Sequence, residues 1–241
     1  NKSNVAAAMG GGLLWALVDA GVEAHRAKVA EETVKPLRDA LIGYDFDSVI
    51  QQQTKATLAA IDWFMPSDYG FVKEINLDNR SAKLSATASK EMAFVDYEYG
   101  MSANFDALEL NCRISIANKN VPHDSKPVAR LYPDNLAYTQ WHKVVVPLNN
   151  ASKEMPENVS KWSANNAVLT KQGLETALKF VQDMIKRGLL QSAENQKVIE
   201  QGKRVVAGGY GGNLIEKTGD TTLLWLPMPN DQWVLVASPV G

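Results

Sequence analysis

Every second residue between positions 108 and 116 is apolar, and this alternation constrains the fold more than any other feature of the chain. The apolar residues are Leu108, Leu110, Cys112, Ile114 and Ile116, and between them lie Glu109, Asn111, Arg113 and Ser115. Successive side chains of a β-strand point to opposite faces of the sheet. The stretch therefore predicts a strand with one buried and one solvated face, as is common in antiparallel sheets.

A partner strand is predicted directly before it, over residues 92–99 (MAFVDYEY), with Tyr97 and Tyr99 on one face. The intervening GMSANFD, residues 100–106, contains the Gly, Ser, Asn and Asp that turns favour. These segments predict an antiparallel hairpin at the centre of the molecule.

Three helices are predicted from apolar residues at helical spacing. They cover residues 13–42, 47–61 and 162–187. Pro36 should kink or divide the first helix because it removes a backbone donor, and Gly43 should end it. Lys186 and Arg187 suit the last turn of the third helix, and Gly188 would form a left-handed cap just beyond it.

Other short segments predict strands. Residues 71–77 and 137–148 are expected to be strands, and residues 79–90 a polar connection or a short helix. From Lys203 onward, short apolar runs alternate with turns, which predicts a meander of three or four strands.

We expect a boundary near residues 190–202, which would separate an α+β domain over residues 1–200 from a small β-meander module over 201–241. The predicted fold class is α+β: an antiparallel sheet of about four strands, covered on one face by helices, with a small C-terminal β-meander.

Composition excludes one class of partner and one kind of cross-link. The formal net charge of −2 offers no basic surface for nucleic acid, so no nucleic-acid partner is expected. Cys112 is the single cysteine, so no intramolecular disulfide can form. Its place in the apolar row predicts a buried, inert thiol.

No catalytic, cofactor or metal residue is predicted, and no cofactor is expected. His25, His123 and His142 have no partner at a spacing typical of zinc sites. His142 is expected to be a solvent-facing or hydrogen-bonded sheet residue. The chain also has no G-x-S-x-G elbow and no P-loop, which favours a protein that is not an enzyme.

Two short motifs allow a structural and a chemical interpretation. Asp45 and Asp47 could be paired carboxylates, but a helix cap is the more economical interpretation. GGYGG, residues 208–212, could present backbone amides to an anion, but a hairpin turn or bulge is favoured because the lysine and hydroxyl of a phosphate cradle are missing.

Four aromatic residues of the predicted strands and of the GGYGG motif also allow two interpretations. Tyr97, Tyr99, Trp141 and Tyr210 could be packing residues of the sheet, or they could line a groove for a glycan or a peptide. Trp141 is expected on the face of its strand opposite His142.

The chain begins with Asn1, so we expect an upstream segment to have been removed. Residues 5–18 carry no charge, but fourteen residues fall short of the ~20 that span a membrane. They predict a buried helix start, or a glycine-rich surface at Gly10, Gly11 and Gly12 that packs on a partner or a bilayer.

Several segments together resemble a known group of proteins. The segments are GGLLWALVDAGVEAHRAKVAEETVKPLRDALIGYDFD, VDYEYGMSANFDALELNCRISI and the helix that begins at Trp162. They resemble uncharacterised proteobacterial envelope lipoproteins and, more distantly, small α/β domains of envelope proteins of the Tol and curli-secretion systems. The resemblance covers most of residues 5–190 and implies a cleaved signal peptide and a lipid-modified cysteine upstream of this chain.

The resemblance implies a location in the periplasm or at the outer membrane, with the lipid anchor as the only membrane contact and other envelope proteins as partners. The leading hypothesis is therefore a non-catalytic envelope lipoprotein that acts through protein contacts. The alternative is a small-molecule, peptide or glycan-binding module. A hydrolase that assembles Asp45, Asp47 and a histidine is the third hypothesis.

Overall fold

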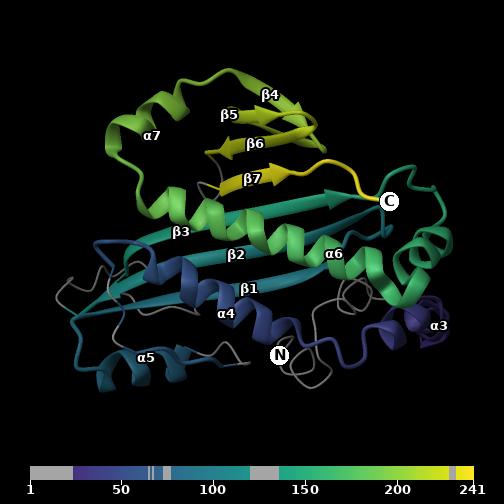
Figure 1. The fold of residues 1–241 in the computed structure, drawn as a ribbon, viewed down its shortest axis with the longest axis horizontal. Coiled ribbons are helices and arrows are strands. Elements are labelled where there is room, and N and C mark those ends of the chain that lie inside the picture. Colours follow the sequence, from purple (N-terminus) through teal and green to yellow (C-terminus); the bar gives the residue numbers. More distant parts are fainter. Residues whose placement is uncertain (1–23, 65, 67, 73–76, 120–135, 228–231) are drawn as a thin grey trace.

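The computed structural model describes residues 24–64, 66, 68–72, 77–119, 136–227 and 232–241. The described part has the α+β class that the sequence predicts, with five helices and one sheet (Figure 1). The helices are α3 (Ala24–Ala40), α4 (Phe46–Ala59), α5 (Leu77–Ala86), α6 (Met155–Leu189) and α7 (Ala193–Glu200).

The sheet has seven strands, so the prediction of about four understates it. The strands are β1 (Glu91–Met101), β2 (Ala107–Asn118), β3 (Leu136–Pro147), β4 (Arg204–Ala207), β5 (Tyr210–Thr218), β6 (Thr221–Leu226) and β7 (Gln232–Val236). Their spatial order is β1-β2-β3-β7-β6-β5-β4. The predicted meander is therefore not a separate sheet, because it extends the first three strands.

Two antiparallel ladders make up this sheet. We call β1, β2 and β3 the N-terminal ladder, and β7, β6, β5 and β4 the C-terminal ladder. Among the described strands they meet at one parallel pair, β3 with β7. Helix α7 occupies the predicted boundary near residues 190–202. The division into units 1–200 and 201–241 stays a prediction.

Helices α4 and α6 lie against one face of the sheet (Figure 1). Helix α6 packs on β2 and β3, and α3 and α4 pack on α6. The apolar row predicted from the alternation lies beneath this layer, with Leu108, Leu110 and Ile114 each 0% exposed. The prediction of a buried face is confirmed, as is the hairpin, in which Tyr97 is opposite Cys112.

The predicted solvated face is only half correct. Glu109 and Asn111 are partly exposed, but Arg113 and Ser115 are buried. The guanidinium of Arg113 lies 4.7 Å from the centre of the Trp141 ring, and its Nε donates to Ser115 Oγ at 3.2 Å. Side chains of neighbouring strands thus cover residues that alternation alone assigns to water.

Some local predictions fail for identifiable reasons. Residues 71 and 72 are not in a strand and α5 begins at Leu77, so the strand over 71–77 is wrong where the structure describes it. Phe71 and Val72, which suggested a strand, belong to a loop. Pro36 lies inside α3 without dividing it, and Gly43 ends that helical segment with a φ of +82° as predicted. The rest of the predicted first helix, residues 13–23, lies outside the described residues.

Helix α6 departs from its prediction at both ends. It begins at Met155, and residues 164–167 interrupt it with a left-handed turn in which Asn165, Asn166 and Ala167 have positive φ. Gly188 is not the predicted left-handed cap, because the helix continues through it to Leu189. Gly188 instead makes room for the side chain of Gln140 on β3, whose amide would have to move if a Cβ were added.

Trp162 joins the first part of α6 to the central hairpin. Its side chain is 0% exposed, and its Nε1 donates to the carbonyl oxygen of Phe105 at 2.7 Å. Phe105 is itself buried and has a φ of +55°, a conformation that costs energy for a side chain of this size. The indole therefore stabilises a strained carbonyl in the β1–β2 connection.

We predict that Trp162→Phe lowers the free energy of unfolding by about 1–3 kcal/mol, because it leaves the buried Phe105 carbonyl without its donor. The measurement is chemical denaturation followed by circular dichroism. Trp63→Phe is the matched control: Trp63 is 53% exposed, and water can replace its hydrogen bond, so a loss below about 1 kcal/mol is expected. Equal losses in the two variants would contradict this role of Trp162.

Candidate functional site

The face of the sheet away from α4 and α6 carries a polar cluster across β2 and β3. Lys143 Nζ lies 2.7 Å from Glu109 Oε2, and Tyr210 from β5 places its ring 5.3 Å from the same ammonium. Burial opposes the charge of Lys143, but hydrogen bonds with Glu109 and Tyr210 outweigh it and raise the lysine pKa. The cluster is closed by internal pairing, so it offers a partner no free charge.

Tyr210 reaches this cluster from the GGYGG motif. Gly208 and Gly209 have φ of +54° and +82° and form the turn between β4 and β5, as predicted. A Cβ at Gly208 would lie 2.9 Å from Val236 Cγ1 on β7, so the turn approaches the sheet closely. The turn and its close approach to Val236 thus explain the glycines at 208 and 209, so these residues give no support to the interpretation as an anion site.

At the other edge of this face, α5 contacts the sheet through an ion pair between Arg80 and Asp96 of β1. The side chains of both residues are largely buried, at 7% and 16% exposed. The Arg80 guanidinium also lies 5.1 Å from the centre of the Phe94 ring. This pair holds α5 against β1 rather than presenting charge to a ligand.

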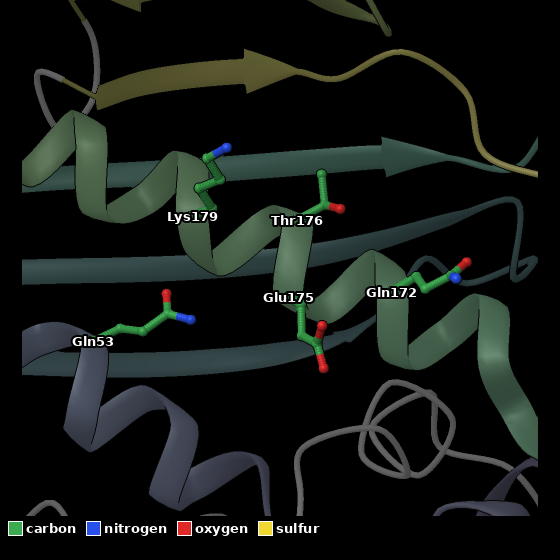
Figure 2. Close-up of a pocket in the computed structure, with 5 residues that line it drawn as sticks. All are labelled: Gln53, Gln172, Glu175, Thr176 and Lys179. Atoms are coloured by element: carbon green, nitrogen blue, oxygen red, sulfur yellow. The ribbon is translucent and has the colours of Figure 1, made fainter.

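A shallow groove lies between α4 and α6, on the helical side of the molecule (Figure 2). Gln53 of α4 and four residues of α6 line it: Gln172, Glu175, Thr176 and Lys179. Gln53 and Glu175 point into the space between the two helices. The volume is about 350 Å³, which would suit a small ligand, but every lining residue has a polar side chain and the groove is open to solvent.

Beside this groove, the interior between α4, α6 and β1 holds a hydrogen-bonded cluster. Tyr97 Oη lies 2.7 Å from Thr54 Oγ1 and accepts from Gln182 Nε2 at 2.9 Å. Burial is the main cause that raises the pKa of Tyr97. Gln182 Oε1 is buried and has no hydrogen-bond partner among the described residues. Tyr97 therefore has an internal structural role and does not line a groove.

The four aromatic candidates of the sequence do not come together. Tyr97 and Tyr99 face the helices, and Tyr99 packs edge-on against Phe46 of α4 at 5.1 Å between ring centres. Trp141 and Tyr210 lie on the other face, against Arg113 and Lys143. Because the sheet separates the two pairs, the four residues cannot form one binding groove.

The histidine and carboxylate candidates also stay apart. Asp45 is exposed and caps α4, accepting from the backbone N of Ser48 at 3.1 Å, which confirms the predicted cap. Asp47 lies in the first turn of the same helix. His142 is instead fully buried in the sheet. Among the described residues, no group of three His, Cys, Asp or Glu side chains could hold a metal ion.

The prediction for His142 itself is wrong. The side chain is 0% exposed, and neither ring nitrogen has a hydrogen-bond partner in the described part of the chain. Burial lowers its pKa to about 3, and burial raises the pKa of the neighbouring Cys112 thiol. Both groups are therefore neutral near pH 7, as the prediction of an inert thiol requires. The side chain of His25 and all of His123 lie outside the described residues.

The loop between α4 and α5 exposes a group of large apolar side chains. We call its described residues 60–64, 66 and 68–72 the aromatic loop. Its exposed members are Trp63 at 53%, Tyr69 at 39%, Phe71 at 45% and Val72 at 49%. Leu190, which follows α6, is 53% exposed and directly follows Leu189, whose carbonyl accepts from Trp63 Nε1 at 3.2 Å.

Sequence reasoning missed the aromatic loop because its end was assigned to a strand. The available signal was the density of aromatic residues in DWFMPSDYGFV, residues 62–72, among the Pro, Ser, Asp and Gly that mark a loop. Large aromatics in such a segment have few neighbouring residues to cover them, so an exposed surface could have been inferred.

The architecture defines a class of fold: helices α4 and α6 lie on one face of a mixed sheet of seven described strands. Comparison with models of known families, with curated proteins and with solved structures gave no significant match. Among the helices in the described ranges, none combines the length and the apolar character needed to cross a membrane.

We predict that Gln182→Glu at pH 7 lowers the free energy of unfolding by about 2 kcal/mol or more, because a carboxylate would replace a neutral amide in a buried cluster. Burial raises the pKa of the new carboxyl in the folded state. The loss therefore grows as the pH rises above its unfolded value of about 4.3 and disappears in acid. Urea denaturation at pH 4 and pH 7 measures it.

Gln172→Glu, at an exposed position of the same helix, is the control and should change stability by less than about 0.5 kcal/mol. If Gln182→Glu changed the free energy of unfolding as little as Gln172→Glu does, water would reach the buried cluster. The groove in Figure 2 would then extend inward to Gln182.

Proposed function

We propose that this chain is a non-catalytic protein of the cell envelope, in the periplasm or tethered by lipid at the outer membrane, that acts by binding another protein through the aromatic loop. The envelope assignment rests on the sequence resemblance. The binding surface rests on one structural observation: four large apolar side chains of a single loop are each more than a third exposed.

The composition of the aromatic loop supports a protein partner. Trp, Tyr and Phe are enriched in the buried cores of protein interfaces, which are surrounded by a polar rim. Here Lys55 Nζ lies 5.1 Å from the centre of the Tyr69 ring, and Asp62 and Asp68 are exposed polar residues of the same loop. Contiguous exposed apolar side chains commonly mark interaction sites on soluble proteins.

The position of the aromatic loop also suits recognition. Trp63 is fixed to the end of α6 by its bond to the Leu189 carbonyl, and its ring packs edge-on against Phe64 at 5.7 Å. A side chain held in place before binding loses less conformational entropy when a partner covers it. Trp63 is therefore the expected anchor of the interface.

We predict that a photoreactive amino acid at Phe71 forms a covalent adduct with a specific envelope protein in native cells, whereas the same group at Val206 does not. Val206 is 75% exposed on the edge strand β4, so it tests exposure without the aromatic surroundings.

With the partner purified, Phe71→Ser should weaken binding about tenfold or more, and Val206→Ser should leave Kd unchanged. Both variants should unfold like the native protein.

A second candidate, a small-molecule or peptide-binding module, is favoured by the groove between α4 and α6 (Figure 2). The same binding assay separates the two. If Phe71→Ser binds normally and Glu175→Ala with Lys179→Ala does not, the groove is the site and the aromatic-loop proposal fails.

The envelope assignment makes its own prediction. The native protein should be recovered in the membrane fraction with a lipid-bearing N-terminal cysteine, visible in its intact mass, or in the periplasmic fraction. Recovery from the cytosol with an unmodified N-terminus would contradict it. That result would leave the interaction surface to be tested with partners from the cytosol.

A further inference from the structure

The parallel pair β3–β7 is the joint on which the continuity of the sheet depends. Residues 141–145 pair with 232–236, and beyond them Ala237 N donates to Val145 O at 2.9 Å and Val240 N to Pro147 O at 2.9 Å. Among the described strands, no other pairing connects the N-terminal ladder to the C-terminal ladder. Loss of this pair would break the strand pairing between four strands and the rest of the sheet, and leave side-chain contacts such as Arg187 with Glu216 and Tyr210 with Lys143.

His142 lies inside this joint. It is opposite Trp233 of β7 on one side and opposite Cys112 of β2 on the other. Its ring meets the Trp233 ring edge-on, with 5.9 Å between centres. The imidazole is 0% exposed, and neither nitrogen is hydrogen-bonded within the described residues, so it occupies the joint as an apolar group would.

Burial is the cause that lowers the pKa of His142, and no described acid acts on it. Asp96 of β1, whose charge helps to raise the pKa of Cys112, is paired with Arg80. The neighbour from β2 is the Cys112 thiol, next to Tyr97 of β1, and both of these groups are neutral. The residues of α6 buried against the sheet are not titratable; its charged residues are exposed or, at Lys171, partly exposed. Lys143 and Glu109 lie on the opposite face of the sheet.

We propose that His142 is an acid-sensitive latch of the sheet: proton uptake by its imidazole separates β7 from β3 and detaches the C-terminal ladder, while the N-terminal ladder stays packed against α6. The physical reason is that an imidazolium needs water or acceptors on both nitrogens, and the closed joint supplies neither. This inference is independent of the proposed binding surface.

The direction of the pH effect follows from proton binding. Burial lowers the pKa of His142 to about 3 in the closed joint, whereas an exposed histidine has a pKa of about 6.5. Between these values the open state binds one more proton than the closed state. The joint is therefore fully stable above about pH 6.5, and stability is lost progressively as the pH falls towards about 3.

Besides the cluster of Lys143, Glu109 and Tyr210, an ion pair near the surface links α6 to the C-terminal ladder. Arg187 of α6 pairs with Glu216 of β5 at 2.5 Å, on the surface. The hydrogen bond from Arg187 lowers the pKa of Glu216 below 4.5, so this pair stays charged at pH 5. Measurements between pH 7.5 and pH 5 therefore isolate His142 from it.

The test is amide hydrogen exchange of the full chain at pH 7.5 and pH 5, corrected for intrinsic exchange rates. We expect the opening constant of the β3–β7 amides to rise about 30-fold at pH 5, while that of the β1–β2 amides changes less than about twofold. An equal rise of the opening constant in all strands would mean global unfolding. No rise would mean that protonation does not open the β3–β7 pair. Either result would overturn the proposal.

Variants assign the effect to one residue. His142→Phe, which keeps an aromatic ring without a titrating group, should abolish the difference between pH 7.5 and pH 5. The double variant His25→Gln with His123→Gln should retain it. If the difference between pH 7.5 and pH 5 persisted in His142→Phe, or was lost in the double variant, His142 would not be the group that opens the joint.

A spectroscopic measurement on the native protein covers the case in which His142→Phe fails to fold. The nuclear magnetic resonance signal of the His142 ring should show no titration near pH 6.5 while the joint is closed. A titration near that value with β3 and β7 still paired would overturn the proposal, because the closed joint would then tolerate the charge.

Discussion

The structure depends on the burial of one face of β2 and β3 beneath α6. The apolar row from Leu108 to Ile116 supplies the sheet side of this contact, and the buried residues of α6 supply the other. Apolar side chains removed from water on both elements provide the main stabilising term. The remaining helices are arranged around this contact: α3 and α4 pack on α6, and Trp162 connects α6 to the central hairpin.

The C-terminal ladder extends this core through the parallel pairing of β3 with β7. Parallel strands need a long connection, and here α6, α7 and the strands β4 to β6 lie between β3 and β7 in the chain. Contacts between residues this distant in sequence slow folding, because a long loop must close before they form. In our proposal, the buried side chain of His142 makes the pairing of β3 with β7 depend on protonation.

The function that we propose is carried by a surface of this scaffold, the aromatic loop. On the sheet, Lys143 is paired with Glu109, and the buried thiol of Cys112 is neutral near pH 7. The aromatic loop differs because its apolar side chains have few neighbours. Contact of these apolar side chains with water is unfavourable in free energy, and a protein partner that buried them would remove this contact.

Local patterns predicted much of the fold. Strict alternation determined β2 and its buried face, turn residues determined the hairpin, and helical spacing located α4 and most of α6, because each depends on neighbours in sequence. Tertiary contacts decided the rest. The pairing of β3 with β7, the burial of Arg113 against Trp141 and the contact of Gly188 with Gln140 join residues far apart in the chain. The exposure of the aromatic loop likewise depends on which other segments cover it. No periodicity encodes such contacts, so the sequence determined the elements and packing determined which of their side chains meet water.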